Sequence, residues 1–133
     1  MSDLVLIDTS AWIRFFRTGE ENRRATDEVE RLMESDRACY TEPVYVELAI
    51  GARSQDELRD GFVALHLLNA GESEWRWAWE TAFKLREKGL YAGATDLVIA
   101  GAAVSRGVRV FHHDKHFRWI AEVSALEEYS YQA

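Results

Sequence analysis

Three apolar stretches of this sequence each contain a single charged residue, and in each case that residue is an acid. The acids and their stretches are Asp8 in 4–13, Glu47 in 43–52 and Asp96 in 90–105. A buried carboxylate is costly unless it is paired, hydrogen-bonded or bound to a metal ion, and none of these stretches supplies a local Lys or Arg. The pattern therefore predicts that the three acids meet in one place and share a cation.

A fourth acid, Asp114, stands close behind the apolar run 108–111, just as Asp8 directly follows the apolar run 4–7. If both runs are strands of an open α/β sheet, the two acids lie at the carboxyl ends of strands, where ligands bind. Asp96 falls in the first turn of an expected helix and can face the same edge. Four carboxylates at that edge form a hard, oxygen-rich site suited to Mg²⁺ or Mn²⁺.

Each acid also has a purely structural interpretation. Asp8 could end a strand by hydrogen-bonding a turn, Asp96 could stabilise a helix dipole, and Asp114 could be an ordinary surface residue. Glu47 is harder to explain in this way, because its helix contains no other acid. The coincidence of all four favours a functional site over four separate structural roles.

The elements expected around these acids alternate between strands and helices. Short apolar runs predict strands at 4–7, 38–40 and 108–111, with a last one at 125–126. Helical patterns follow Asp8 and occupy 22–34, 55–66, 74–88 and 95–106, and another helix opens at 41–43. The expected N-caps are Thr9 or Ser10, Thr41 and Thr95. Helices that are apolar nearly all round, at 43–52 and 95–105, are expected to be buried. The alternation predicts an α/β fold with a mostly parallel sheet.

Composition narrows the class of protein further. A chain of 133 residues with 47 % hydrophobic and 12 % aromatic residues is one folded domain, 1–133, rather than a disordered linker. A net charge of −7 argues against a broad basic surface for nucleic acid, and one cysteine excludes a disulfide framework. No signal peptide or membrane span is recognisable, so we expect a soluble, cytoplasmic chain without a membrane partner.

Four motifs, taken in order, resemble those of the PIN-domain nucleases and, within them, the VapC-type toxins of toxin–antitoxin pairs. They are VLIDTSAWI at 5–13, VELAIG at 46–51, ATDLVIA at 94–100 and HDKHF at 113–117. Each motif is weak alone, whereas the ordered set is specific. The resemblance implies a three-layer α/β/α sandwich around a mostly parallel central sheet. It also implies an endoribonuclease that depends on Mg²⁺ or Mn²⁺, RNA as substrate, a homodimer, and a cognate antitoxin that blocks the site.

The resemblance also assigns roles to particular residues. The catalytic and metal-holding acids are Asp8, Glu47, Asp96 and Asp114, and the supporting residues are Thr9, Ser10 and His113. The metal activates a water for in-line attack on the phosphate, so no protein nucleophile is required. His113 departs from the family pattern, which places a small hydroxyl or amide residue near the fourth acid. A hydroxyl there would help to hold a metal-bound water, and His113 as a neutral imidazole could do the same.

Two surfaces are expected beside the acids. The basic residues that could hold the RNA backbone are Arg14, Arg17, Lys115 and Arg118, although surface solvation explains any one of them. The aromatic residues expected to form part of an antitoxin groove are Trp12, Phe15 and Phe16. Farther along the chain, Trp75 and Trp79 are expected in the core and Trp77 on the surface, because residues two apart on a helix point in different directions.

Other function classes remain open from the sequence. A catalytically weak PIN-like module would bind RNA or a partner without cutting, but it would lack an acid, and none is missing. A metal-dependent phosphatase or phosphotransfer enzyme would use Asp8 as nucleophile, but haloacid-type phosphatases need a second Asp where Ser10 stands. His112 and His116 have the spacing of one helical turn, but they lack the Glu after the first His that a zincin requires.

Overall fold

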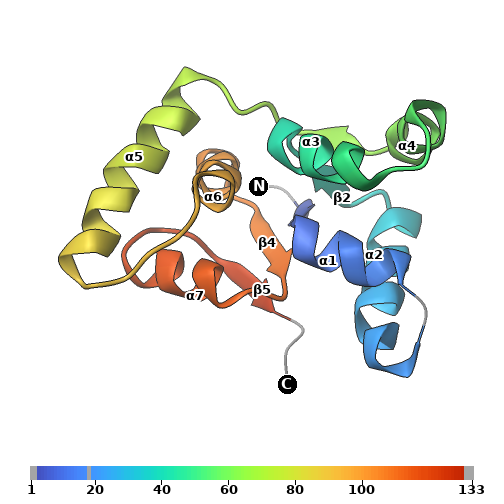
Figure 1. The fold of residues 1–133 in the computed structure, drawn as a ribbon, viewed down its shortest axis with the longest axis horizontal. Helices are drawn as coiled ribbons and strands as arrows, with labels where there is room; N and C mark the ends of the chain where they lie inside the picture. The colour runs from blue at the N-terminus through green and yellow to red at the C-terminus, as the bar shows by residue number, and fades with distance from the viewer. Residues whose placement is uncertain (1–2, 18, 131–133) are drawn as a thin grey trace.

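Short strands and longer helices alternate along the chain in the computed structural model, which describes residues 3–17 and 19–130 (Figure 1). The strands are β1 (Val5–Ile7), β2 (Ala38–Tyr40), β3 (His66–Leu67), β4 (Arg109–His112) and β5 (Glu128–Ser130). The helices are α1 (Thr9–Phe16), the 3-10 turn η1 (Glu20–Asn22), α2 (Arg23–Glu34), α3 (Glu42–Gly51), α4 (Gln55–Phe62), α5 (Glu72–Glu87), α6 (Ala94–Arg106) and α7 (Lys115–Glu122). The expected domain limits, residues 1 and 133, lie outside the described residues.

Within the described residues, the strands form one parallel sheet of five in the order β3-β2-β1-β4-β5. Strand β1 is central and fully buried, as its continuous apolar sequence predicts. From β1 the chain adds β2 and β3 on one side of the sheet and then crosses over to add β4 and β5 on the other side. The carboxyl ends of β1 and β4 therefore flank the switch point at which open α/β sheets bind ligands. Asp8 follows β1, and Asp114 follows β4 after one intervening residue.

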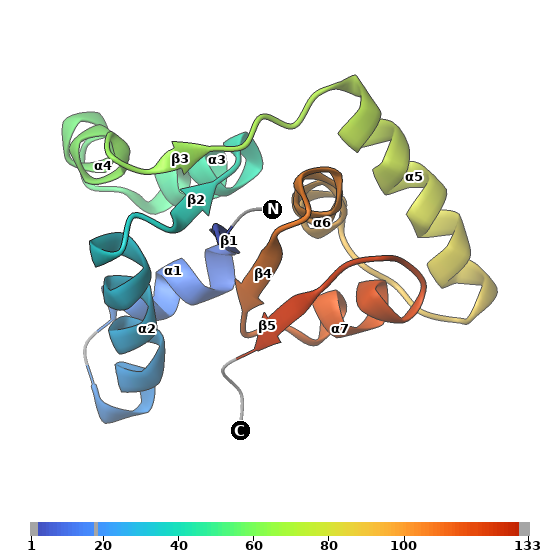
Figure 2. The ribbon, with the colours of Figure 1, turned by 180° about the vertical axis from the view of Figure 1, so that it is seen from behind.

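Helices pack around this sheet in the expected α/β/α arrangement. Helices α1 and α2 pack against each other, and α6 contacts β4. Helix α5 lies outside α6, away from the sheet, in both ribbon views (Figures 1 and 2). None of the described helices combines the length and apolar character needed to cross a bilayer. The α/β sandwich with a parallel central sheet is thus confirmed.

Helix α6 is the buried helix that its sequence predicts. Its residues from Leu97 to Ala103 are all buried, and Gly107 closes it in a left-handed conformation. A Cβ built on Gly101 would lie 3.0 Å from the Glu74 carbonyl oxygen and 3.1 Å from the Trp77 ring. The small residues of α6 therefore allow α5 to approach closely. This packing fixes α6, and with it Asp96, relative to the sheet.

Several expected elements are corrected by the structure. The helix expected at 55–66 ends at Phe62, because His66 and Leu67 instead form β3 by pairing with Cys39 and Tyr40. The last strand is Glu128–Ser130 rather than 125–126. It lies at the edge of the sheet, where a continuous apolar run is not needed. Helix α7, of eight residues, is not among the helices that the sequence pattern predicts.

Helix caps and helix burial also differ from expectation. Asp8, not Thr9 or Ser10, caps α1, and Gly93, not Thr95, precedes α6. The apolar helix α3 is not buried all round, since Val46 is 59 % exposed and Ile50 is 84 % exposed. An apolar sequence does not by itself distinguish a buried helix from one that has an apolar face at the surface.

The tryptophan assignment on α5 is reversed. Trp75 and Trp79 are about half exposed, whereas Trp77 packs against the core. The reason is that Trp77 lies on the face directed at Gly101 of α6. Trp75 and Trp79, one turn apart, share the outer face.

Candidate metal and active site

Asp8 is the most buried of the four acids, with 2 % of its surface exposed. It caps α1, and its Oδ2 accepts hydrogen bonds from the Ser10 amide at 3.0 Å and the Ser10 hydroxyl at 2.7 Å. Its other oxygen, Oδ1, is buried and has no hydrogen-bond partner among the described residues. Burial raises the pKa of Asp8 to about 6, although the bonds from Ser10 oppose that rise. One oxygen is thus fixed by the protein, and the other is left for a ligand.

Ser10 connects the ends of the two central strands. Its hydroxyl donates to Asp8 and accepts a hydrogen bond from the His113 amide at 3.0 Å. The Asp8 amide also donates to the Phe111 carbonyl at 3.0 Å. His113 is therefore linked to the site through its backbone. Burial and the nearby Arg14 lower the pKa of its imidazole, which favours the neutral ring.

Asp96 stands in the first turn of α6, as expected, and about a fifth of its side chain is exposed. Its pKa is raised to about 7, first by burial and then by the charges of Asp8, Asp114 and Glu47. Ligand atoms of Asp96 and Asp114 lie within 4.8 Å of each other, while Asp8 and Glu47 act on Asp96 through their charges. The structure thus gathers at one site the four acids that the sequence singles out.

Glu47 occupies a different position from the one its apolar helix predicts. It is exposed rather than buried, and its Oε1 accepts a short hydrogen bond from the Thr9 hydroxyl. Its charge nevertheless raises the pKa of both Asp8 and Asp96. Glu47 therefore lies at the open side of the acidic cluster, held there by the first residue of α1.

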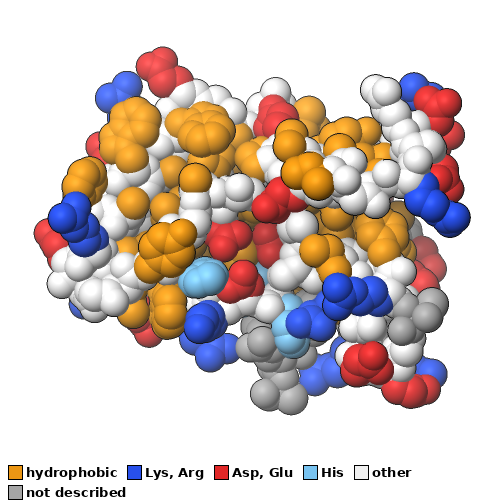
Figure 3. Space-filling model, in the orientation of Figure 1, with side chains coloured by type: hydrophobic (Ala, Val, Ile, Leu, Met, Phe, Trp, Pro, Cys, Tyr) orange, Lys and Arg blue, Asp and Glu red, His pale blue; other side chains and the backbone are white. Residues whose placement is uncertain are grey.

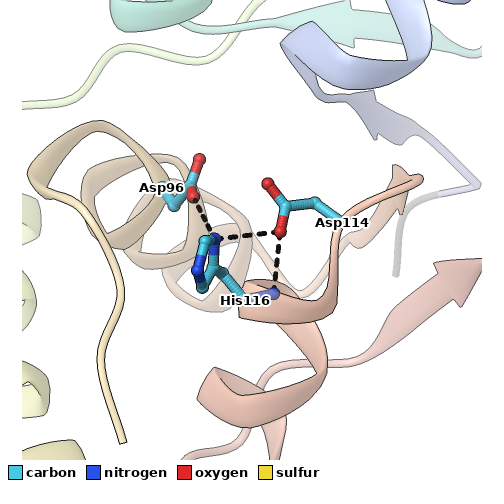
Figure 4. Close-up of side chains that lie close together, drawn as sticks. All are labelled: Asp96, Asp114 and His116. Carbon is cyan, nitrogen blue, oxygen red and sulfur yellow. Dashed lines mark hydrogen bonds and ion pairs between the residues drawn. The ribbon is translucent and has the colours of Figure 1, made fainter.

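Asp114 and Asp96 are bridged by a histidine that the sequence reasoning did not include in the site (Figure 4). The Nδ1 of His116 lies 2.9 Å from Asp114 Oδ1 and 3.6 Å from Asp96 Oδ2. The Asp114 carboxylate caps α7 by accepting from the His116 amide at 2.8 Å. The sequence contains a signal for this contact. Asp114 follows a strand and caps the next helix, and His116 two positions later lies in the first turn of that helix.

Lys and Arg side chains of the described residues do not pair with the acidic cluster. Within residues 3–17 and 19–130, none of the four acids is in an ion pair with Lys or Arg. Figure 3 shows acidic and histidine side chains gathered at the centre of one face, with basic side chains near its lower edge. Carboxylates of this density, one with a buried unpartnered oxygen, match the oxygen donors that Mg²⁺ and Mn²⁺ require.

The expected RNA-contacting residues lie around this region. Arg14 is partly buried on α1, and its charge is one of the causes that lower the pKa of His113. Arg17 is exposed just beyond α1. Lys115 and Arg118 are exposed on α7, where the Lys115 ammonium lies 5.3 Å from the Trp119 ring. Arg14 is thus on the helix that follows β1, Arg17 just after that helix, and Lys115 and Arg118 on the helix that follows β4; their contact with RNA stays a prediction.

An apolar groove of about 580 Å³ opens beside the acids between α1, α3 and α4. Its apolar lining includes Ile13, Phe16, Leu48 and Leu58, and its charged lining residues are Arg17, Glu47, Arg53 and Glu57. Phe16 lines this groove and is 57 % exposed, and its contact with an antitoxin stays a prediction.

The other two aromatic residues assigned to the groove do not form its surface. Trp12 is 1 % exposed and packs on Phe62 with ring centroids 4.8 Å apart, so it is a core residue and its assignment to the groove is wrong. Phe15 is partly buried against the core. Trp12 and Phe16 are one helical turn apart and share a face of α1, with ring centroids 6.0 Å apart. Only tertiary packing separates them: Phe62 covers Trp12, whereas Phe16 stands at the end of α1 and stays exposed.

Comparison with known proteins gives a consistent family match. The family model of the PIN domain matches residues 5–123. Ribonuclease VapC11 of Mycobacterium tuberculosis is 31 % identical over 143 aligned residues, covering 97 % of this chain and 100 % of that protein. Ribonuclease VapC21 of the same organism is 29 % identical and covers 93 % of this chain and 91 % of its own length.

Solved structures share the fold at lower identity. DNA-bound VapBC from Salmonella typhimurium has a TM-score of 0.73 at 23 % identity, with 99 % of this chain and 100 % of that chain covered. The match extends over the whole sheet and the helices around it, including the elements that carry the four acids.

Proposed function

The chain belongs to the PIN-domain family, and from that premise we propose that it is a divalent-metal-dependent endoribonuclease, the toxin of a type II toxin–antitoxin pair. It acts as a single domain over residues 1–133, in the cytoplasm, where its RNA substrate is found. Its relatives of about 30 % identity are named ribonucleases, so the hydrolysis of RNA is the activity that the family supports.

The observation that carries this proposal is the convergence of four acids from separate elements. Asp8 follows β1, Glu47 lies on α3, Asp96 begins α6 and Asp114 caps α7. Burial and then the charges of the other three acids raise the pKa of Asp96, and no Lys or Arg among the described residues forms an ion pair that offsets them. Such an arrangement lowers stability unless a cation occupies it, and this is the cost expected of a functional site.

The residues present fit Mg²⁺ or Mn²⁺. Asp8 Oδ1 is buried without a partner, and Asp96 and Asp114 offer further carboxylate oxygens nearby. Asp8, Asp96 and Asp114 would hold the ion, with Glu47 at the open side. When bound, a divalent ion neutralises charge on a phosphate and lowers the pKa of water.

The chain's own residues prepare this chemistry. The two hydrogen bonds from Ser10 hold the Asp8 carboxylate in one orientation, and Thr9 does the same for Glu47. Because Asp8 is buried, few waters compete for its free oxygen. The neutral ring of His113 adds no positive charge, and Arg14 nearby can contact a phosphate of the RNA backbone.

A protein partner is part of this proposal. The groove beside Glu47 is apolar and suited to an amphipathic helix of an antitoxin, with Phe16 as one contact and a basic residue reaching the acids. A structure that shares this fold, VapBC-5 from Mycobacterium tuberculosis, is described as a member of the VapBC family of toxin–antitoxin systems. A homodimer is also expected from the family, and the exposed apolar side chains Val46 and Ile50 on α3 supply one surface for it.

The test is RNA cleavage by the purified full chain in Mg²⁺ or Mn²⁺, with and without EDTA. We expect cleavage that stops with EDTA and falls by more than about 100-fold in Asp8→Asn and Asp114→Asn. Asp56→Asn is the matched control, because Asp56 is an exposed acid paired with Arg59. This variant should cleave RNA as the wild type does. Cleavage by a contaminating nuclease would instead be equal in all the variants, Asp8→Asn and Asp114→Asn included.

Three results would contradict the proposal. Cleavage that survives EDTA and is lost only when His113 is replaced would indicate acid–base catalysis by histidine. Release of phosphate from a small phosphomonoester without cleavage of RNA would favour the phosphatase alternative. A chain that binds RNA but does not cleave it in any divalent ion would favour a binding module.

A further inference from the structure

The histidine between Asp96 and Asp114 is unexplained by an all-oxygen metal site. His116 is the second residue of α7, which Asp114 caps, and its ring points into the acidic cluster rather than to solvent (Figure 4). About a quarter of its side chain is exposed. Among the described residues, the hydrogen-bond and ion-pair partners of this ring are the carboxylates of Asp96 and Asp114 alone.

The other histidines of the segment are engaged elsewhere. His112 is fully buried in β4, where its Nε2 contacts Glu128 at 2.9 Å and its Nδ1 accepts from the Asp114 amide at 3.1 Å. Both nitrogens of His112 are therefore used in holding the strand end. The zinc-like pair of His112 and His116 that their spacing suggests does not exist. His116 belongs with the acids instead.

The ring of His116 is held in place by aromatic neighbours. Its centroid lies 6.0 Å from that of Tyr91 and 5.4 Å from that of Trp119, and both rings are steeply inclined to it. These contacts fix the ring without using either nitrogen as a hydrogen-bonding atom. The Nδ1 atom is thus presented to the carboxylates by packing from α7 and from the segment before α6.

Donor atoms of Asp96, Asp114 and His116 all lie within 4.8 Å of one another. Ligand atoms on opposite sides of a small divalent ion are about 4.2 Å apart, so the three atoms nearly span one coordination shell. A second observation points to the same ligand: the buried, unpartnered Oδ1 of Asp8, whose charge acts on Asp96. The site therefore offers one nitrogen among several oxygens.

We propose that His116 supplies a nitrogen ligand to the ion held by Asp96 and Asp114, and that this nitrogen makes the site select Mn²⁺ over Mg²⁺. Mg²⁺ is a hard ion bound by oxygen, whereas imidazole nitrogen suits transition ions. The inference rests on the metal site of the proposed function and specifies its donor set.

The test uses the purified, metal-stripped full chain and Mn²⁺ alone as probe. Binding is followed by the EPR signal of free Mn²⁺, and pulsed EPR reports nitrogen coupled to bound Mn²⁺. We expect wild type to show ¹⁴N coupling, His116→Asn to lose it, and His113→Asn to keep it. Competition with Mg²⁺ should show that His116→Asp binds both ions but that its preference for Mn²⁺ is reduced roughly tenfold.

The outcomes separate this inference from the function on which it rests. Bound Mn²⁺ without ¹⁴N coupling in wild type, or with coupling that persists in His116→Asn, overturns the nitrogen ligand and leaves the acidic metal site standing. An unchanged preference for Mn²⁺ in His116→Asp overturns the selectivity. Mn²⁺ binding that is absent, or indifferent to Asp96→Asn, contradicts both proposals. Circular dichroism of each variant checks the fold, and His116→Asp provides an independent second variant if His116→Asn does not fold.

Discussion

Removing the charge of Asp96 should stabilise the metal-free protein at pH 8. Its pKa is raised from 3.8 to about 7 by burial and by three neighbouring acids. One pKa unit corresponds to about 1.36 kcal/mol, so the ionised carboxylate lowers the free energy of unfolding by about 4 kcal/mol above pH 7. Asparagine keeps the shape of the side chain and removes this repulsion.

The net gain is smaller than the electrostatic cost. The buried amide loses about 1–2 kcal/mol of solvation, and the favourable interaction of an acid with the first turn of α6 is worth about 0.3–1 kcal/mol. The remainder is a stabilisation of about 1–3 kcal/mol for Asp96→Asn. In a domain of this size that corresponds to a melting temperature higher by roughly 4–12 °C.

The dependence on pH has a definite sign. Because the folded-state pKa of Asp96 is raised, the folded protein binds more protons than the unfolded chain between pH 3.8 and about 7. The stability of metal-free wild type should therefore rise as pH falls through this range, and it should be lowest above pH 7. The advantage of Asp96→Asn should be largest at pH 8 and vanish near pH 5.

Thermal melts in EDTA and in Mn²⁺, at pH 8 and pH 5, provide the assay. Wild type should gain about 3 kcal/mol at Mn²⁺ concentrations 100-fold above its dissociation constant, and Asp96→Asn should gain little. The control is Asp56→Asn, which removes a first-turn acid from α4 where the side chain is 78 % exposed. This control should melt like wild type or slightly lower, with an unchanged response to Mn²⁺.

One result would refute the reasoning. If Asp96→Asn melts below metal-free wild type at pH 8 and still responds to Mn²⁺, Asp96 stabilises the helix N-terminus and does not hold the ion. The metal site would then consist of the other three acids.

Two further predictions concern packing beside the site. Trp12→Ala should lower the free energy of unfolding by about 3–5 kcal/mol because the ring is buried, whereas Phe16→Ala should leave the melting temperature nearly unchanged because its ring is 57 % exposed. Equal effects of the two substitutions in thermal melts would contradict this division. Gly101→Ala should cost about 1–3 kcal/mol, since its methyl group would press on the α5 backbone at 3.0 Å, while Gly61→Ala, in open space, should not destabilise. Denaturant unfolding of both glycine variants decides that comparison.

Much of the architecture could be predicted because it follows from the hydrophobic pattern within single strands and helices. The continuous apolar run of β1 requires burial on both faces, and the small apolar residues of α6 require a covered helix. Strand β3 and helix α7 could not be predicted in this way. The two residues of β3 pair with β2, and only that pairing overrides a helical pattern that continues through them.

The sequence by itself determined which side chains are candidates for the chemistry. Asp8, Glu47 and Asp96 stand out because each lies in an apolar segment without a basic residue, and Asp114 because it closely follows an apolar strand. The strand–helix order predicts that they meet at one edge of the sheet. Burial is costly for an isolated charge wherever the chain folds, so this signal is visible without coordinates.

Tertiary structure alone decided which neighbours these acids have. His116 contacts Asp96 across 20 positions of sequence because α7 packs against α6. Trp12 and Phe16 share one face of α1, but the Phe62 ring of α4 packs on Trp12 while Phe16 stays exposed. Helical periodicity predicts which residues share a face, whereas only tertiary packing decides which of them are covered. Local sequence fixes the type of each side chain, whereas its partners depend on long-range contacts between elements.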